Sequence, residues 1–176
     1  EERWYNFYDY QEITEKGILK DYKVTSNTIG LFIKGGAILP VKHRLRRSTK
    51  LLRFEPITLI IALNSEDTAQ GIIYFDDEES NDYEEKNKFF MKKIHFQKNE
   101  LFIAHITDDF KISNKIEKII ITGLKRKIID IKMKNFVEGY EEELEFVQNG
   151  DITCIKRANI SMEYLWKINF NYLEEK

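Results

Sequence analysis

The sequence has few of the residues that cross-link or interrupt a chain. Its 176 residues include one cysteine, Cys154, and two prolines. A single cysteine excludes an internal disulfide and a metal site built from several cysteines. With only eight glycines and no low-complexity stretch, the sequence shows no flexible linker. The fold therefore depends on a hydrophobic core, and 42% hydrophobic residues are enough to form one.

Long apolar runs and an excess of either charge are also missing. No run reaches the roughly 18–20 residues that cross a bilayer, and no signal peptide opens the chain. The 28 basic and 30 acidic residues give a net charge of −2. This balance argues against nucleic acid or a membrane as a partner. The chain begins with Glu1 in place of methionine, so we expect a piece of a longer polypeptide that determines its localisation.

Short runs of alternating apolar and polar residues extend along most of the chain. Such alternation, with turn-like breaks at residues 64–67, 98–99 and 149–150, is typical of β-strands. The expected strands are Trp4–Tyr8, Ile18–Thr25, Leu31–Lys34, Ala37–Val41, Ile57–Leu63, Thr68–Phe75, Lys88–Gln97, Glu100–Thr107, Ile116–Thr122, Ile128–Met133, Glu143–Gln148, Asp151–Arg157 and Tyr164–Asn171. No amphipathic helix of a dozen residues stands out. The sequence predicts an all-β fold, either a sandwich or a barrel.

A charged connection at residues 42–50 separates the first strands from the others. A long and regular series of strands begins after Arg53–Pro56. We therefore expect two units. Residues 1–54 form the end of one β-domain, and residues 55–176 form an antiparallel β-sandwich.

Two charged runs are candidates for ligand binding. The acidic run Asp76–Tyr83 offers oxygen ligands that suit Ca²⁺, but an EF-hand loop would need glycine and glutamate where Asn81 and Asn87 stand. We expect a solvated loop and no metal. The basic run Lys42–Lys50 has no complementary basic surface elsewhere. We expect it to be a solvated or interdomain connection, not a phosphate site.

Two of the three histidines, His95 and His105, lie on one predicted hairpin with a two-residue turn at residues 98–99. This turn places His95 opposite Phe102 and His105 opposite Lys92. Side chains alternate between the faces of a sheet, so the two histidines point to opposite sides. The pattern therefore predicts ordinary packed or surface histidines and no shared metal site.

The sequence indicates no nucleophile. Cys154 lies in an alternating apolar strand, where a packed thiol is expected. No Gly-x-Ser-x-Gly elbow is present. Asn159-Ile160-Ser161 matches the N-glycosylation pattern, but about one such match is expected by chance in an asparagine-rich chain.

Aromatic residues raise carbohydrate binding as an alternative function. Modules built on β-sandwiches bind sugars with exposed Trp and Tyr rings, because a ring stacks on the apolar face of a pyranose. Seven residues are candidates for such a platform: Trp4, Tyr5, Tyr8, Tyr10, Tyr83, Tyr140 and Tyr164. Most strand aromatics belong to a core, so a carbohydrate-binding module stays the alternative.

The segment Leu31–Pro40 carries the most specific pattern. Two apolar runs are joined by Gly35-Gly36 and closed by Pro40, which by itself indicates a hairpin or a close backbone approach. This segment resembles the "V-F-x-R-G-G-x-I-x-P" stretch of glycoside hydrolase family 31.

Other landmarks follow in the order of that family. Residues 4–10 resemble its "W-Y-D" strand, with Asn6 where aspartate is usual. Residues 68–77 resemble its "A-x-G-x-L-Y-x-D-D-G" strand and loop, with Glu78 in place of the glycine. Residues 44–48 and 56–63 resemble the glucosidase II branch of the family.

The resemblance implies a fragment without catalytic groups. In this family the β-domains follow a (β/α)₈ barrel that carries both catalytic aspartates, and no barrel pattern is present here. Residues 1–54 would end the proximal β-domain, and residues 55–176 would form the distal one. We assign no catalytic, cofactor-binding or metal residue. The implied partners are the barrel of the parent chain, a glucosidase II β subunit through that parent, and carbohydrate. The implied parent trims glucose from N-linked glycans in the endoplasmic reticulum lumen.

Overall fold

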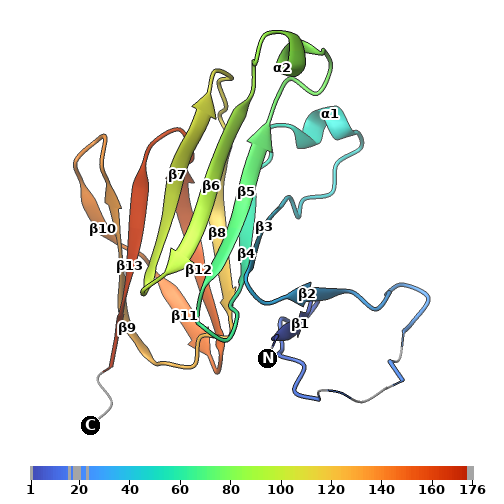
Figure 1. The fold of residues 1–176 in the computed structure, drawn as a ribbon, viewed down its shortest axis with the longest axis vertical. Helices are drawn as coiled ribbons and strands as arrows, with labels where there is room; N and C mark the ends of the chain where they lie inside the picture. The colour runs from blue at the N-terminus through green and yellow to red at the C-terminus, as the bar shows by residue number, and fades with distance from the viewer. Residues whose placement is uncertain (1, 16, 18–20, 23, 174–176) are drawn as a thin grey trace.

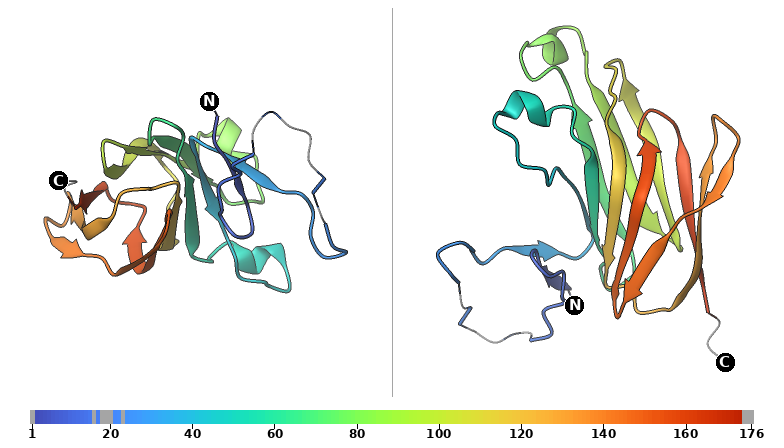
Figure 2. Two further views of the ribbon diagram at one scale, coloured as in Figure 1. Left: turned by 90° about the horizontal axis from the view of Figure 1, so that it is seen from below. Right: turned by 180° about the vertical axis from the view of Figure 1, so that it is seen from behind.

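The computed structural model describes residues 2–15, 17, 21–22 and 24–173. Within them, β1 (Trp4–Asn6) and β2 (Phe32–Lys34) form a small antiparallel sheet beside a large sheet of eleven strands (Figures 1 and 2). The large sheet contains β3 (Ala37–Val41), β4 (Ile57–Ala62), β5 (Ala69–Phe75), β6 (Phe90–Gln97), β7 (Glu100–Asp108), β8 (Lys115–Thr122), β9 (Ile128–Asn135), β10 (Glu141–Glu143), β11 (Phe146–Asn149), β12 (Ile152–Ser161) and β13 (Trp166–Tyr172). Two short helices, α1 (Thr49–Leu52) and α2 (Asp82–Glu85), lie in connections. Neither helix is long or apolar enough to cross a membrane.

The large sheet curls on itself. Its strand order is β10-β9-β13-β7-β6-β5-β3-β4-β8-β12-β11, so β10 and β11 lie at opposite edges. Only two residues, Leu144 and Glu145, join these strands along the chain. The two edges must therefore lie close together, which requires the sheet to roll into a sandwich. This confirms the expected all-β fold, although β3–β5 and β4–β8 pair in parallel among otherwise antiparallel neighbours.

The alternation pattern located twelve of the thirteen expected strands. The exception is Ile18–Thr25, of which residues 18–20 and 23 lie outside the described residues and the rest are not in a strand. Strand β10 was not expected. Its sequence is three exposed glutamates, which carry no apolar alternation.

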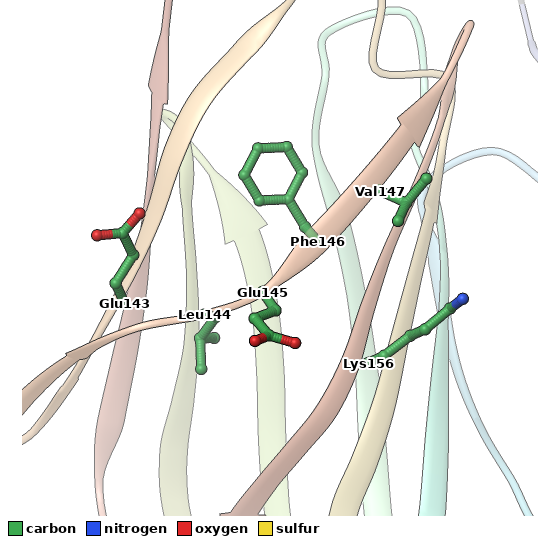
Figure 3. Close-up of a pocket in the computed structure, with 6 residues that line it drawn as sticks. All are labelled: Glu143, Leu144, Glu145, Phe146, Val147 and Lys156. Atoms are coloured by element: carbon green, nitrogen blue, oxygen red, sulfur yellow. The ribbon is translucent and has the colours of Figure 1, made fainter.

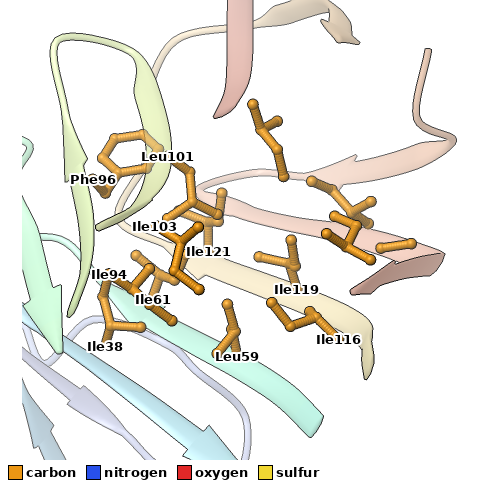
Figure 4. Packing of buried hydrophobic residues seen from close by; sticks show 14 of the residues in the cluster. Ile38, Leu59, Ile61, Ile94, Phe96, Leu101, Ile103, Ile116, Ile119 and Ile121 are labelled. Carbon is orange, nitrogen blue, oxygen red and sulfur yellow. The ribbon is translucent and has the colours of Figure 1, made fainter. Parts of the chain in front are cut away.

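The inner face of the rolled sheet holds the main core, which is rich in isoleucine (Figure 4). Ile61, Ile94 and Ile121 come from three different strands and are fully buried. Strand β4 is buried at all six positions. Its odd positions, such as Leu59, face the main core, and Ile60 and Ala62 belong to a second cluster on the outer face. Because both of its faces are covered, five of its six residues are apolar.

The β6–β7 hairpin has the predicted register. His95 pairs with Phe102 and His105 with Lys92, and the turn residues Lys98 and Asn99 both have positive φ. The His95 ring stacks on Phe102 with centroids 5.3 Å apart. His105 lies on the other face, opposite the buried Lys92, whose ammonium donates to the Glu163 carbonyl at 2.7 Å. The two histidines therefore lie on opposite sides, as predicted.

The division into residues 1–54 and 55–176 stays a prediction. Strands β3 and β4 lie on either side of that boundary and pair along their whole length. Backbone hydrogen bonds thus join the two expected units directly.

Candidate functional site: an anchored small sheet with an open apolar face

The small sheet packs on the outer face of the large one. Tyr5 and Ile33 pair with each other across β1 and β2, and both are buried against Ile60 and Ala62 of β4. Apolar side chains of the N-terminal segment and of β3 surround this cluster: Phe7, Tyr10, Ala37, Leu39 and Val41. Burial of this area attaches the N-terminal segment to the sandwich.

Polar contacts fix the position of the small sheet. The buried guanidinium of Arg3 binds both carboxylate oxygens of Glu12, at 3.1 and 2.8 Å, and donates to the carbonyl of Gly123 at 3.2 Å. The Tyr5 hydroxyl donates to the Leu63 carbonyl at 2.6 Å. A bidentate, charge-assisted contact is strongly directional. These bonds therefore determine the register of the small sheet on the ends of β4 and β8.

Two glycines allow this close approach. A Cβ on Gly123, whose φ is +91°, would lie 2.2 Å from the Tyr5 hydroxyl. A Cβ on Gly35 would lie 2.8 Å from the Leu63 carbonyl oxygen, and the Gly35 amide donates to the Arg3 carbonyl at 2.7 Å. The glycine pair of the Leu31–Pro40 segment thus joins β2 to β3 where the backbones meet.

The opposite face of the small sheet is open. Trp4 on β1 and Phe32 on β2 point away from the sandwich and are 42% and 39% exposed. Tyr22 packs edge-on against Phe32 with centroids 5.0 Å apart, and its hydroxyl accepts a hydrogen bond from the Asn6 amide at 2.6 Å. Further exposed apolar side chains lie near this sheet in the sequence: Tyr8, Val24, Ile29 and Leu31. We call Trp4, Tyr22 and Phe32 the open apolar face.

Such a surface indicates a partner. Aromatic residues are enriched in the cores of protein interfaces, and all three residues of this face are aromatic. The hydrogen bonds of Arg3 and Tyr5 hold β1 in a fixed position on the large sheet, so Trp4 on β1 is held in place as well. The arrangement can dock a protein surface.

No family model matches the chain. Curated relatives do match: neutral alpha-glucosidase AB of Homo sapiens is 32% identical over 173 residues, which are 96% of this chain and 18% of the relative. The protein of the same name from Dictyostelium discoideum is 36% identical over 129 residues, 71% of this chain and 13% of the relative. The chain belongs to the α-glucosidases of glycoside hydrolase family 31. It spans less than a fifth of the length of these relatives.

Solved structures of the family share the fold. A heterodimeric complex of ER glucosidase II, consisting of the catalytic subunit and the binding domain of the regulatory subunit, superposes with a TM-score of 0.82 at 24% identity. That match covers 97% of this chain and 20% of the solved chain. A glucosidase II alpha subunit bound to alpha3-Glc2 gives a TM-score of 0.78 at 23% identity. At this identity the likeness establishes the fold alone.

The structure shows what the two departures from the family pattern, Asn6 and Glu78, do locally. The Asn6 side-chain oxygen accepts from the Tyr8 amide at 2.8 Å, a contact that an aspartate could also make. Glu78, in place of glycine, has a φ of +56°, the left-handed conformation that glycine adopts freely. A non-glycine residue has a conformational cost at this φ, so the turn after Asp77 is strained at Glu78.

The basic run forms part of an ion-pair cluster. Arg46 binds Glu55, and Arg44 lies between Glu55, at 3.5 Å, and Glu117, at 2.8 Å. Glu55 is only 6% exposed, so its charge needs these partners. These ion pairs hold the connection between β3 and β4 against the sandwich.

The acidic run is a hydrogen-bonded loop that includes α2. The Asp77 carboxylate accepts from the Ser80 hydroxyl at 2.6 Å and from the Ser80 and Glu79 amides. These bonds, the Ser80 hydroxyl first, lower the pKa of Asp77 to about 2. Across the described residues, no group of three or more His, Cys, Asp and Glu side chains is arranged to hold a metal ion.

The remaining sequence candidates are dispersed. Tyr5 is buried, whereas Tyr83 and Tyr140 are exposed in separate loops. Cys154 is partly buried on β12. A hollow of about 350 Å³ lies where the sheet edges meet, lined by the β10–β11 connection and Lys156 (Figure 3). No pattern in the sequence indicates a role for Arg3. The apolar strand that follows it does not show that its side chain forms an ion pair with Glu12 and donates to the Gly123 carbonyl.

Proposed function

We propose that this chain is the non-catalytic C-terminal β-region of a glucosidase II-like α-glucosidase and that it supports the catalytic barrel of its parent. The observation that carries the proposal is the match of almost the whole chain to less than a fifth of a neutral alpha-glucosidase AB. The remaining four fifths of such an enzyme have room for the barrel and both catalytic aspartates. The open apolar face gives this region a surface for docking.

The parent, in this proposal, trims glucose from N-linked glycans in the endoplasmic reticulum lumen. One relative in fold is named as an ER glucosidase II complex with a regulatory subunit, which supports both the location and a β subunit as partner. The catalytic step belongs to the barrel, because retaining hydrolysis needs two carboxyl groups about 5–5.5 Å apart across the glycosidic bond. Residues 1–176 act by holding that barrel.

A chimera tests the proposal. The matched region of the Homo sapiens neutral alpha-glucosidase AB is replaced by residues 1–176, and hydrolysis of a chromogenic α-glucoside is measured. We expect the chimera to keep activity, the truncated enzyme to lose it, and residues 1–176 alone to release no product. Turnover by the isolated chain, or an inactive chimera that is folded by circular dichroism, would refute the proposal.

Charge substitution on the open apolar face sharpens the test. Trp4→Asp and Phe32→Asp place carboxylates in the docking surface and should reduce chimera activity at least tenfold, because burial of an unpaired charge is costly. Ile72→Asp is the matched control, since Ile72 is 51% exposed on β5 of the large sheet. Equal losses in all three variants would show that the open apolar face has no special role.

A second candidate function, carbohydrate binding, is favoured by an aromatic pair on the large sheet. The rings of Tyr74 and Phe89 stack at 5.6 Å with an interplanar angle of 28°, and the Tyr74 hydroxyl donates to Asp76 at 3.0 Å. An exposed ring beside a carboxylate suits a sugar. Calorimetry with maltotriose should then show saturable heat that Tyr74→Ala abolishes. No heat at millimolar ligand removes this candidate.

A further inference from the structure

We propose that Asn159 carries an N-linked glycan whose first sugar lies in a hollow beside Tyr140. The proposal rests on the proposed function only in one respect, which is that the chain enters the endoplasmic reticulum lumen. Asn159-Ile160-Ser161 is the single place in the 176 residues where serine or threonine stands two positions after an asparagine, with no proline between. The fold decides whether this match is usable.

The backbone around Asn159 leaves the sheet ladder. Strand β12 pairs regularly with β8 up to Lys156 and again from Ile160, with a bulge between. Arg157 and Asn159 both have positive φ, at 57° and 49°. Bulges re-aim side chains, and asparagine tolerates this conformation better than most residues. The bulge therefore turns the sequon asparagine out of the regular strand.

The Asn159 side chain is available. It is exposed, whereas its neighbours Ala158 and Ile160 are buried. Among the described residues its amide has no hydrogen-bond partner, in contrast to Asn114, whose amide donates to two backbone carbonyls. A glycan on Asn159 would thus displace no contact of the fold.

A hollow of about 400 Å³ adjoins this asparagine. Its lining includes Tyr140, Glu142 and Arg157 together with Asn159. This volume lies within the range of small-molecule sites. Tyr140 is 42% exposed, so its ring can stack on the C–H face of a sugar, and the charged side chains can bind hydroxyl groups. The hollow therefore suits the first sugar of a chain attached at Asn159.

The modification is a group transfer with a lipid-pyrophosphate-linked oligosaccharide as donor. The Asn159 side-chain nitrogen forms a bond to C1 of the first sugar. The bond from C1 to the pyrophosphate oxygen breaks, the lipid pyrophosphate leaves with the bonding electrons, and the amide loses one proton. A transferase of the host supplies the catalysis.

The test expresses residues 1–176 behind a cleavable secretion signal in cultured insect cells. Cell extract and medium are both treated with a peptide:N-glycosidase and analysed by mass spectrometry. We expect one glycan on the unmodified sequence and a one-dalton gain at Asn159 after release. Asn159→Gln and Ser161→Ala should carry none. Asn149→Gln, on an exposed asparagine outside any sequon, should keep the glycan.

The role of Tyr140 has its own measurement. Tyr140→Ala should leave occupancy unchanged but increase the rate of enzymatic glycan release from the folded protein at least threefold, because the first sugar loses its stacking partner. Folded, translocated protein without a glycan refutes the modification. An unchanged release rate in Tyr140→Ala refutes the placement of the sugar.

The outcome is separable from that of the proposed function. An active chimera with an unmodified Asn159 overturns only the glycan. A modified Asn159 in an inactive, folded chimera overturns only the supporting role of the region.

Discussion

The outer face of the large sheet is covered over β3 and β4 and open over β5, β6 and β7. Ile60 and Ala62 of β4 are fully buried beneath the small sheet, whereas Ile72 and Tyr74 of β5 are 51% and 43% exposed. The burial patterns differ accordingly: all six residues of β4 are buried, whereas every second residue of β5 is exposed. A strand that is buried on both faces has a second covering layer, which β1 and β2 supply here.

The two regions also differ in how precisely they are fixed. The covered face depends on Arg3, Tyr5 and two glycines at the contact. Over β5, β6 and β7, the rings of Tyr74 and Phe89 and those of His95 and Phe102 stack in pairs, and among the described residues no other layer covers them. Substitutions should therefore change the free energy of unfolding strongly where the small sheet covers β3 and β4, and weakly on the outer face of β5, β6 and β7.

The largest effect is expected for Gly123→Ala. The new methyl group meets the Tyr5 hydroxyl and requires a strained positive φ. We expect the free energy of unfolding in urea to fall by about 2–5 kcal/mol. Gly150→Ala is the matched control, because Gly150 also has positive φ but has no atom within 4 Å of the added Cβ. Its cost should be about 1–2 kcal/mol. Equal costs would mean that the contact with Tyr5 is unimportant.

Tyr5→Phe should rank second. It leaves the Leu63 carbonyl without its hydrogen bond and should lower the unfolding free energy by about 1–3 kcal/mol. Tyr74→Phe removes an exposed hydroxyl from β5 and should change the unfolding free energy by less than about 0.5 kcal/mol. Chemical denaturation followed by circular dichroism compares the pair, and a cost for Tyr74→Phe that matches Tyr5→Phe would contradict the distinction.

Alkaline pH should lower the free energy of unfolding through buried tyrosines, including Tyr5. Burial raises the pKa of Tyr5 and raises the pKa of Tyr172 to about 12. In the unfolded chain both ionise near pH 10, so the unfolded state loses protons first and stability falls as pH rises above 10. Below pH 10 these groups contribute no pH dependence.

A series of urea midpoints between pH 8 and 11.5 measures this loss. Tyr5→Phe should make the decline less steep, because one of the ionisations that cause it is gone. A decline as steep as that of the unmodified chain would show that Tyr5 does not titrate differently in the folded state.

A small effect of the opposite sign is expected for Glu78→Gly, in the exposed turn after β5. Glycine relieves the positive φ of Glu78 and should raise the unfolding free energy by about 0.5–1 kcal/mol. Glu79→Gly is the control, since Glu79 has no positive φ, and it should not stabilise. A thermal unfolding scan compares the two, and stabilisation by both would point to a cause other than the turn conformation.

Much of the fold could be predicted because strand alternation is local. The pairing of His95 with Phe102 followed from a two-residue turn, since such a turn fixes the register. Strand β10 could not be found, because three exposed glutamates form a strand only where β9 offers an edge. The parallel pairing of β4 with β8 could not be predicted either, because it joins residues about 60 positions apart in the sequence.

The sequence by itself determined the all-β class, most strand positions and the likeness to family 31. These depend on side-chain periodicity and on short ordered motifs. Tertiary structure alone decided that the small sheet covers β4, that Arg3 meets Glu12 and Gly123, and that Trp4 and Phe32 face outward. The reason is that such contacts join residues up to 120 positions apart, and no local pattern records which distant backbone will supply the partner.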